Sequence, residues 1–368
     1  MTPPPKNPPA RWLQLLFAAL LALALAPVEA MAKPAKTQAR HAAVKPGKAK
    51  LRLAAPRKPA AFGAAAEVSA FVAEMQARHG FDPTQLHRFF ASIERNDAAL
   101  RAIAPAATPE LQRSWERYRM RFVNRQRIDA GLRFWQENDD LLRRAEADYG
   151  VPPEIVTALI GVETAYGANT GRFGVFEVLA TLAFHYPPRA PFFRDELEAL
   201  LLFARERGID PLSLRGSFAG ASGIAQFMPS SLRRFAVDYD GDSRIDLEHS
   251  RADAIGSVAR YLAAHGWQSG APVTLPARVD GDPGALLAAG MKPSVPVGEL
   301  ARQGVLTAAE VEPERQAALI RLSSPEADDE YWATFDNFWV ITRYNRSSFY
   351  AMAVFQLAQA LRTGEEQR

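Results

Sequence analysis

Apolar residues recur at helical spacing along the chain from residue 63 onward. The first helix has an apolar face made by residues three and four positions apart, Val68, Phe71, Val72 and Met75. The same periodicity predicts further helices at residues 141–149, 154–166, 197–204, 254–265 and 338–361. The pattern therefore predicts a mostly helical protein, and the sequence contains no internal repeat.

Residues 270–330 depart from this helical spacing. Short apolar runs at 273–275 and 319–322 are typical of strands, and Gly and Pro residues lie between them. We therefore expect an α+β fold that is mostly helical and carries a small inserted α+β lobe. The expected division is a signal segment at 1–32, a basic linker at 33–62, a helical catalytic region at 63–270, the inserted lobe at 271–330 and a C-terminal helical part at 331–362.

The first 32 residues have the three parts of a secretory signal. Lys6 and Arg11 supply a positive start, and the apolar run at 12–26 is too short to span a membrane comfortably. Residues 30–32 (AMA) form a small-x-small cleavage site. The segment predicts export to the periplasm, with an uncleaved anchor as the alternative.

The formal net charge of +3 does not describe the whole chain. Residues 1–60 hold 11 of the 44 Lys and Arg residues and a single acid, Glu29. Residues 33–60 are basic and rich in Pro and Ala, so we expect a disordered linker. This linker either associates weakly with membrane headgroups or anionic wall polymers, or is only a solvated spacer. The remaining 308 residues carry more acids than bases and give no electrostatic reason to expect nucleic-acid binding.

The chain contains no cysteine. This excludes a disulfide, a thiolate zinc site and a thiol nucleophile. It also argues against a lipoprotein anchor, which requires a cysteine directly after the signal.

One carboxyl group stands out in the helix expected at 154–166. The helix is apolar almost all round and should be buried, and Glu163 lies near its end, one turn from Leu159 and Ile160. Burial should raise the pKa of this carboxyl. A glutamic acid of raised pKa is the group that protonates a leaving glycosidic oxygen near neutral pH. The alternative is a structural glutamate, paired with an arginine or exposed at the helix end.

Residues 216–230 combine small side chains with a few neutral polar groups. Glycines allow close backbone approach or make room for a bulky substrate. Ser217 and Gln226 are hydrogen-bonding groups suited to sugar hydroxyls and amides. Tight helix packing is the alternative interpretation of this segment.

Residues 238–246 resemble a calcium-binding EF-hand loop. Acids occupy positions 1, 3, 5 and 9, namely Asp238, Asp240, Asp242 and Asp246. Two positions depart from the pattern, since Ser243 replaces the usual glycine and His249 replaces the bidentate glutamate. Acids so close together repel one another unless a cation neutralises them. We expect a structural Ca²⁺ that takes no part in chemistry, with an ordinary acidic loop as the alternative.

Five segments together resemble a known family. They are IGVET at 160–164, ATLAF at 180–184, GSFAGASGIAQFMPSS at 216–231, DAIGS at 253–257 and ITRYNRS at 341–347. In this order they closely resemble the membrane-bound lytic murein transglycosylase B family, and the resemblance covers roughly residues 65–362. It implies a lysozyme-like catalytic core and a peptidoglycan lytic transglycosylase.

The resemblance also implies which residues form the site. Glu163 matches the family's single general acid/base. The residues that match substrate-binding positions are Tyr118, Arg189, Ser217, Gln226, Tyr261, Tyr344 and Asn345. The residues that match calcium ligands are Asp238, Asp240, Asp242, the carbonyl of Arg244, and Asp253. Pro188 and Phe192 replace an arginine and a tyrosine of the family, which puts contacts to the peptide stem in doubt.

The implied reaction cleaves the MurNAc-β-1,4-GlcNAc bond and leaves 1,6-anhydroMurNAc ends, without an organic cofactor. The expected partners are peptidoglycan glycan strands, and we expect a monomer. A hydrolysing muramidase, which needs a second carboxylate, and a non-catalytic peptidoglycan-binding protein remain alternatives. A calcium sensor is a further alternative, although the single imperfect loop disfavours it.

Overall fold

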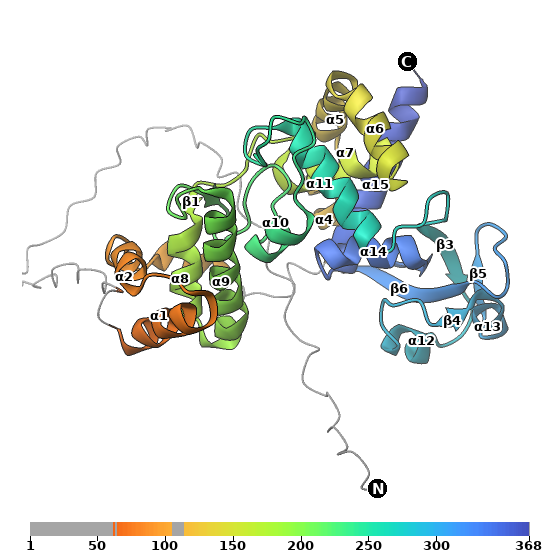
Figure 1. The fold of residues 1–368 in the computed structure, drawn as a ribbon. Coiled ribbons are helices and arrows are strands. Elements are labelled where there is room, and N and C mark those ends of the chain that lie inside the picture. The colour runs from red at the N-terminus through yellow and green to blue at the C-terminus, as the bar shows by residue number, and fades with distance from the viewer. Residues whose placement is uncertain (1–61, 63–64, 105–113, 368) are drawn as a thin grey trace, which may run out of the picture.

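The computed structural model describes residue 62 and residues 65–104 and 114–367 (Figure 1). The expected signal segment and nearly all of the basic linker lie outside these residues. Within the described residues, three hydrophobic clusters organise the chain into a central lobe, a helical lobe and a sheet lobe. None of the helices found among them is both long and apolar enough to cross a membrane.

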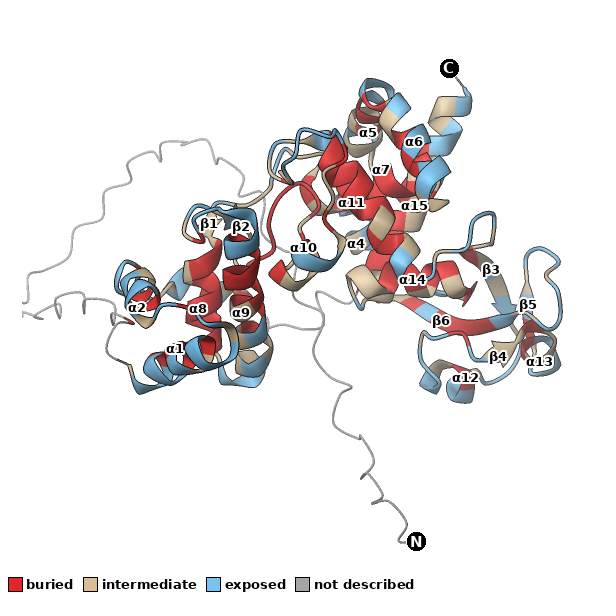
Figure 2. Cartoon of the chain, in the orientation of Figure 1, coloured by how far each residue is buried: buried red, intermediate tan, exposed pale blue. Residues whose placement is uncertain are grey.

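The central lobe is built around helix α7, which is almost entirely buried (Figure 2). Its helices are α4 (Trp115–Phe122), α5 (Arg125–Glu137), α6 (Asp139–Tyr149), α7 (Pro153–Thr164), α10 (Pro229–Phe235), α11 (Arg251–Ala264), α14 (Asp336–Tyr344) and α15 (Ser348–Glu366). Helix α7 packs against α5, α6, α11 and α15. Apart from Glu154 and Glu163, every residue of α7 is buried, because a helix without a continuous polar face has no side to present to water.

The helical lobe forms the second cluster. It consists of α1 (Ala66–His79), α2 (Pro83–Ala91), α3 (Asp97–Ile103), α8 (Val175–His185), the short 3-10 helix η3 (Pro187–Arg189) and α9 (Ala190–Arg207). Strands β1 (Phe173–Gly174) and β2 (Arg215–Gly216) pair antiparallel at its edge. The expected catalytic region at 63–270 thus contains two separate hydrophobic cores.

The sheet lobe carries a five-stranded antiparallel sheet among the described residues, in the order β4-β6-β7-β3-β5. Its elements are β3 (Thr274–Val279), α12 (Gly284–Ala288), β4 (Val295–Pro296), α13 (Val297–Arg302), β5 (Val305–Thr307), β6 (Gln316–Ser324) and β7 (Ala327–Thr334). The strands expected at 273–275 and 319–322 fall in β3 and β6. The prediction of a mostly helical α+β fold with a small inserted lobe is therefore confirmed.

The single helix expected at 338–361 is wrong in one respect. The chain forms two helices there, α14 and α15, which are separated at residues 345–347. Asn345 has an extended backbone, and the Ser347 hydroxyl accepts a hydrogen bond from the amide of Tyr350. A serine in this position satisfies an unpaired amide of the first turn, so it starts a new helix.

Candidate active site

Helix α7 ends in a strained turn directly after the predicted catalytic residue. The helix ends at Thr164, two residues before the expected end, because Ala165, Tyr166 and Gly167 all have left-handed backbones with φ of 52°, 63° and 87°. Two of these three residues are not glycine, and such a conformation persists only where its surroundings enforce it. The turn places Glu163 in the last turn of a buried helix.

The side chain of Tyr166 holds this turn against helix α5. Its hydroxyl donates to the carbonyl of Arg127 at 3.0 Å, and its ring lies 5.5 Å from the ring of Phe134. The guanidinium of Arg127 in turn donates to the carbonyl of Gly161. A Cβ atom at Gly161 would lie 2.6 Å from the Tyr166 hydroxyl oxygen. The glycine of the IGVET segment is therefore required by the close approach of Tyr166.

The Glu163 carboxyl is half-buried and accepts a hydrogen bond from Tyr350. The Tyr350 hydroxyl oxygen lies 2.5 Å from Glu163 Oε1. Burial raises the pKa of Glu163 to about 7, and the bond from Tyr350 opposes this rise because it stabilises the charged form. The carboxyl is therefore about half protonated at neutral pH.

Three of the predicted groove tyrosines lie around Glu163. The charge of Glu163 contributes to a raised pKa at Tyr118, Tyr261 and Tyr344, in each case after burial as the largest cause. The ring centroids of Tyr261 and Tyr344 are 4.7 Å apart. Their hydroxyls donate to backbone carbonyls, from Tyr344 to Ala225 at 2.5 Å and from Tyr261 to Arg343 at 2.7 Å. Tyr261 and Tyr344 therefore have fixed orientations, and the three tyrosines lie on three different helices.

Sequence reasoning missed Tyr350, the residue that contacts Glu163 most directly. Its side chain is fully buried on helix α15, amid apolar neighbours. Periodicity identifies a tyrosine in such a position only as a core residue. The signal available in the sequence was its place just after the ITRYNRS segment.

The small-residue segment at 216–230 is a loop and not a packed helix, apart from the start of α10. Isolated bridges join Ser222 to Gly216 and to Phe227. The Thr164 hydroxyl, next to Glu163, donates to the carbonyl of Ile224 at 2.9 Å. This bond ties the loop to the end of α7.

The two predicted polar residues of this loop are held by local hydrogen bonds. Ser217 Oγ accepts from the amide of Ala221 at 3.1 Å. The side-chain amide of Gln226 donates to the carbonyls of Thr170 and Gly223, each at 2.9 Å. Gln226 also has a left-handed backbone, with φ of 51°. Its side chain therefore has a set orientation beside the end of α7.

The remaining two predicted groove residues lie in different lobes. Asn345 directly follows Tyr344 at the end of α14 and is half-buried. Arg189 belongs to η3 in the helical lobe, where its guanidinium lies 4.4 Å from the ring centroid of Phe192 and 5.0 Å from that of Phe193. Arg189 thus packs against two aromatic rings of the helical lobe.

The acidic loop brings together three of the four carboxylates expected to bind calcium. Oxygens of Asp238, Asp240 and Asp253 lie within 4.8 Å of one another. Asp253 is buried in the first turn of α11 and accepts the amides of Tyr239 and Asp246, both at 2.7 Å. Burial raises its pKa, with a smaller contribution from the charges of Asp240 and Asp238. Converging carboxylates of this kind fit a hard divalent cation.

The fourth expected carboxylate is not part of this group. Asp242 accepts the amide of Arg244 at 2.8 Å, and its oxygens are not among the atoms that converge.

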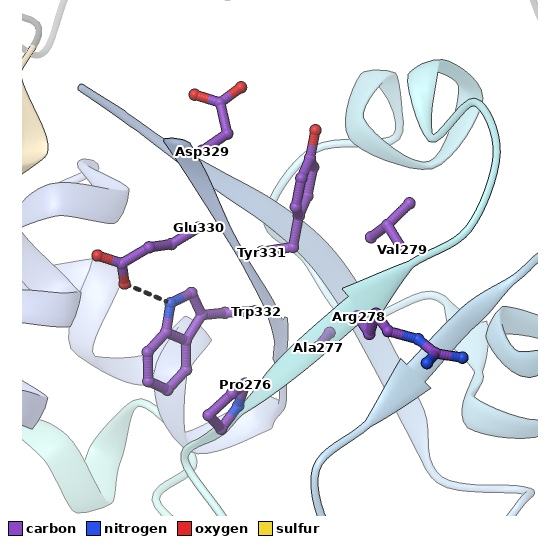
Figure 3. A pocket seen from close by; sticks show the side chains of 8 residues that line it. All are labelled: Pro276, Ala277, Arg278, Val279, Asp329, Glu330, Tyr331 and Trp332. Atoms are coloured by element: carbon purple, nitrogen blue, oxygen red, sulfur yellow. Dashed lines mark hydrogen bonds between the residues drawn. The ribbon is translucent and has the colours of Figure 1, made fainter. Parts of the chain in front are cut away.

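A hollow on the sheet lobe lies apart from the predicted site residues (Figure 3). It opens between strands β3 and β7, which pair only up to Ala277 and Tyr331. Its lining comes from both strands: Pro276, Ala277, Arg278, Val279, Asp329, Glu330, Tyr331 and Trp332. None of the residues predicted to act in catalysis, substrate binding or metal binding lines it.

Comparison with known proteins gives consistent matches. The family model described as the transglycosylase SLT domain matches residues 63–359. The membrane-bound lytic murein transglycosylase B of Escherichia coli is 42% identical over 308 residues, which are 79% of this chain and 81% of that protein.

Two solved structures extend these matches. A lytic transglycosylase of Escherichia coli in complex with calcium is 40% identical, with a TM-score of 0.75 over 84% of this chain and 97% of that one. SltB3 from Pseudomonas aeruginosa in complex with NAG-anhNAM-pentapeptide is 29% identical, with a TM-score of 0.69 over 80% of this chain and 79% of that one.

The fold and the site define a lysozyme-like enzyme that cleaves glycans. A mostly helical frame presents a glutamic acid of raised pKa among tyrosines, as glycan-cleaving enzymes require. The chain belongs to the membrane-bound lytic murein transglycosylase B family, and it is a lytic transglycosylase of peptidoglycan. The resemblance inferred from the five sequence segments is thereby confirmed.

Proposed function

We propose that Glu163 is the single general acid and base of this enzyme. The observation that carries the proposal is a half-buried carboxyl whose pKa is raised to about 7 by burial. Protonated Glu163 donates its proton to the oxygen between N-acetylmuramic acid and N-acetylglucosamine as the C1–O bond breaks. The acetamido group of the muramic acid stabilises the resulting sugar cation.

The second half of the reaction closes a ring within the same sugar. Glu163, now a carboxylate, takes the proton from the C6 hydroxyl as its oxygen bonds to C1, which regenerates the protonated acid and forms the 1,6-anhydro end. The nucleophile is tethered to the reacting ring, so the step has the entropic advantage of an intramolecular reaction. Water takes no part. A single carboxyl suffices because the substrate supplies its own nucleophile.

The groove around Glu163 is proposed to bind the glycan strand. Tyr118, Tyr261 and Tyr344 offer ring faces to the sugars, and their positions around the carboxyl support this role. The polar residues proposed to read hydroxyl, amide and carboxylate groups are Ser217, Gln226, Asn345 and Arg189. The solved complex of SltB3 with a peptidoglycan fragment supports the same class of ligand for this chain. We expect the enzyme to act as a monomer.

The product distinguishes this mechanism from hydrolysis. Digestion of purified sacculi should give muropeptides that end in 1,6-anhydro-N-acetylmuramic acid, lighter by one water than hydrolysis products and resistant to borohydride reduction. In ¹⁸O-water these ends should stay unlabelled in the mass spectrum. A reducing, ¹⁸O-labelled muramic acid as the main product would identify a hydrolysing muramidase, and binding without any product would indicate a non-catalytic wall-binding protein.

The acidic loop is proposed to hold a structural Ca²⁺. Asp238, Asp240 and Asp253 would supply carboxylate oxygens, and Asp242 and the Arg244 carbonyl are the further ligands expected from the sequence. The support is the convergence of three carboxylates and the related Escherichia coli structure solved with calcium. The ion would brace the loop against α11, through Asp253, and would leave the reaction to Glu163.

Calcium should raise the melting temperature of the protein. A ligand that binds only the folded state stabilises it by mass action, by about 2.7 kcal/mol at a hundred times Kd. Differential scanning fluorimetry with calcium and with a chelator measures this shift. Asp240→Ala should abolish it, whereas Asp328→Ala, a change at an exposed acid of the sheet lobe, should leave it intact. Identical curves with calcium and chelator in the unchanged protein would contradict the site.

The N-terminal segments are proposed to deliver the enzyme to its substrate. Residues 1–32 act as the export signal to the periplasm, and residues 33–60 link the catalytic lobes to it.

A further inference from the structure

Helix α4 carries the groove residue Tyr118 and is held at its start by the β6–β7 hairpin of the sheet lobe. Ser114, the N-cap of α4, donates its hydroxyl to Glu326 Oε1 at 2.5 Å. Arg117 forms an ion pair with the same carboxylate at 3.0 Å. The amide of Glu116 donates to Ser324 Oγ at 3.0 Å. The hairpin thus satisfies groups that the first turn of a short helix leaves unpaired.

Glu330 on strand β7 forms a further hydrogen-bonded link to the same helix. Its Oε1 accepts the indole N–H of Trp115 and its Oε2 accepts that of Trp332, both at 3.1 Å. Figure 3 shows the Glu330 carboxylate turned toward Trp332 at the edge of the hollow. Trp115 is 1% exposed, so its N–H would lose its partner in a buried place without Glu330. A buried donor without a partner is costly.

Ring contacts of Trp115 connect Glu330 to the proposed glycan groove. Its ring stacks with that of Tyr118 at 6.4 Å and packs edge-on against Phe349 at 5.5 Å. Tyr118 and Phe349 are also in ring contact, at 5.7 Å. Phe349 directly precedes Tyr350, which donates to Glu163. A continuous set of contacts therefore joins the sheet lobe to the proposed general acid.

We propose that the sheet lobe positions the active site, and that Glu330 is a positioning residue that acts through Trp115 to keep Tyr118 against Glu163. The proposal rests on the proposed function of Glu163. It gives the inserted lobe a role in catalysis itself, and it assigns to the hairpin residues Ser324, Glu326 and Glu330 the task of anchoring α4.

Loss of this anchor should admit water beside Glu163. The groups whose charges or hydroxyls face this carboxyl are Tyr350 from α15, Tyr118 from α4, Tyr344 from α14 and Tyr261 from α11, with Arg121 near Tyr118 and with Arg343 and Arg346 near Tyr261. If Tyr118 moves away, Glu163 is better hydrated and its pKa falls. The enzyme then loses its protonated acid at a lower pH.

Three variants test the proposal. Glu330→Leu removes both acceptor oxygens, and Glu330→Gln keeps one. Glu312→Leu makes the same chemical change at an exposed glutamate of the same lobe, which forms an ion pair with Arg315. We expect Glu330→Leu to lower kcat/KM on the order of tenfold or more, as misplaced catalytic groups do. It should also shift the basic limb of the kcat profile to lower pH. Compared with Glu330→Leu, Glu330→Gln should recover most of the lost kcat/KM and most of the pH shift of the basic limb. Glu312→Leu should match the unchanged enzyme in both quantities.

Other outcomes would overturn the proposal. A lower melting temperature or a raised KM with an unmoved basic limb would reduce Glu330 to a structural or glycan-binding residue. Equal shifts of the basic limb in Glu330→Leu and Glu330→Gln would assign the effect to loss of the Glu330 charge and not to loss of the hydrogen bond to Trp115. If Glu330→Leu fails to fold, Trp115→Phe serves instead, because it keeps an aromatic ring but removes the N–H. The basic limb should then shift to lower pH in the same way. An unmoved limb in this variant would again overturn the proposal. The general-acid role is tested separately with Glu163→Gln, so the two failures remain distinguishable.

Discussion

Glu163→Gln should reduce the cleavage of sacculi by about 10²–10⁴-fold, the usual contribution of general acid catalysis. Glutamine keeps the size and shape of the side chain, and it can still meet the hydroxyl of Tyr350. It cannot transfer a proton to the glycosidic oxygen, nor accept one from the C6 hydroxyl. Release of soluble muropeptides, followed by chromatography, measures the loss, and pull-down with insoluble sacculi should show that binding persists.

The same helix offers a matched control. Glu154 lies in the first turn of α7, where burial also raises its pKa, and it contacts Arg362 at 3.5 Å. Glu154→Gln therefore makes the same change at the other end of the helix, away from the tyrosines. It should keep nearly full activity. A folded Glu163→Gln variant that cleaves as fast as Glu154→Gln would remove Glu163 from the mechanism.

The desolvation of Glu163 follows from the local sequence, because an apolar helix carries this carboxyl near its end. Its catalytic role comes from the family resemblance and stays a prediction. The left-handed turn at Ala165 and Tyr166 cannot be predicted from the local sequence, because neither alanine nor tyrosine favours that backbone conformation. That turn depends on Tyr166 fitting against Gly161 and reaching Arg127, contacts between distant positions that periodicity does not contain.

The acidic loop also shows that contacts between distant positions cannot be predicted from spacing within one segment. Spacing suggests Asp242 as a ligand, whereas Asp253 comes only from the family resemblance and is its least secure ligand, because one extra residue precedes it in this sequence. In the structure, Asp253 joins Asp238 and Asp240, and Asp242 does not. The N-cap serine of α11 sets the start of that helix and so brings Asp253 into the loop. Sequence spacing within a loop cannot predict a ligand that a neighbouring helix supplies.

The pH dependence of the reaction should follow the titration of Glu163. The reaction begins from the protonated acid, and burial raises its pKa to about 7. Activity should therefore be level on the acidic side of this value, as far as the fold permits. Above it, the protonated fraction falls about tenfold per pH unit, so activity should drop by about a hundredfold two units higher. Initial rates of muropeptide release across a pH series measure this limb.

Tyr350→Phe tests whether the titration of Glu163 causes the fall of activity at high pH. The bond from the Tyr350 hydroxyl stabilises the carboxylate, so its removal leaves desolvation unopposed and the pKa of Glu163 should rise. The basic limb should therefore move to higher pH, in the direction opposite to that expected for Glu330→Leu. The phenyl ring fills the same buried space, and the melting temperature should change little. If the limb stays in place in a folded Tyr350→Phe enzyme, a group other than Glu163 limits the rate at high pH. Opposite shifts in the two variants would show that a hydrogen bond from α15 and the exclusion of water by α4 act on one and the same proton.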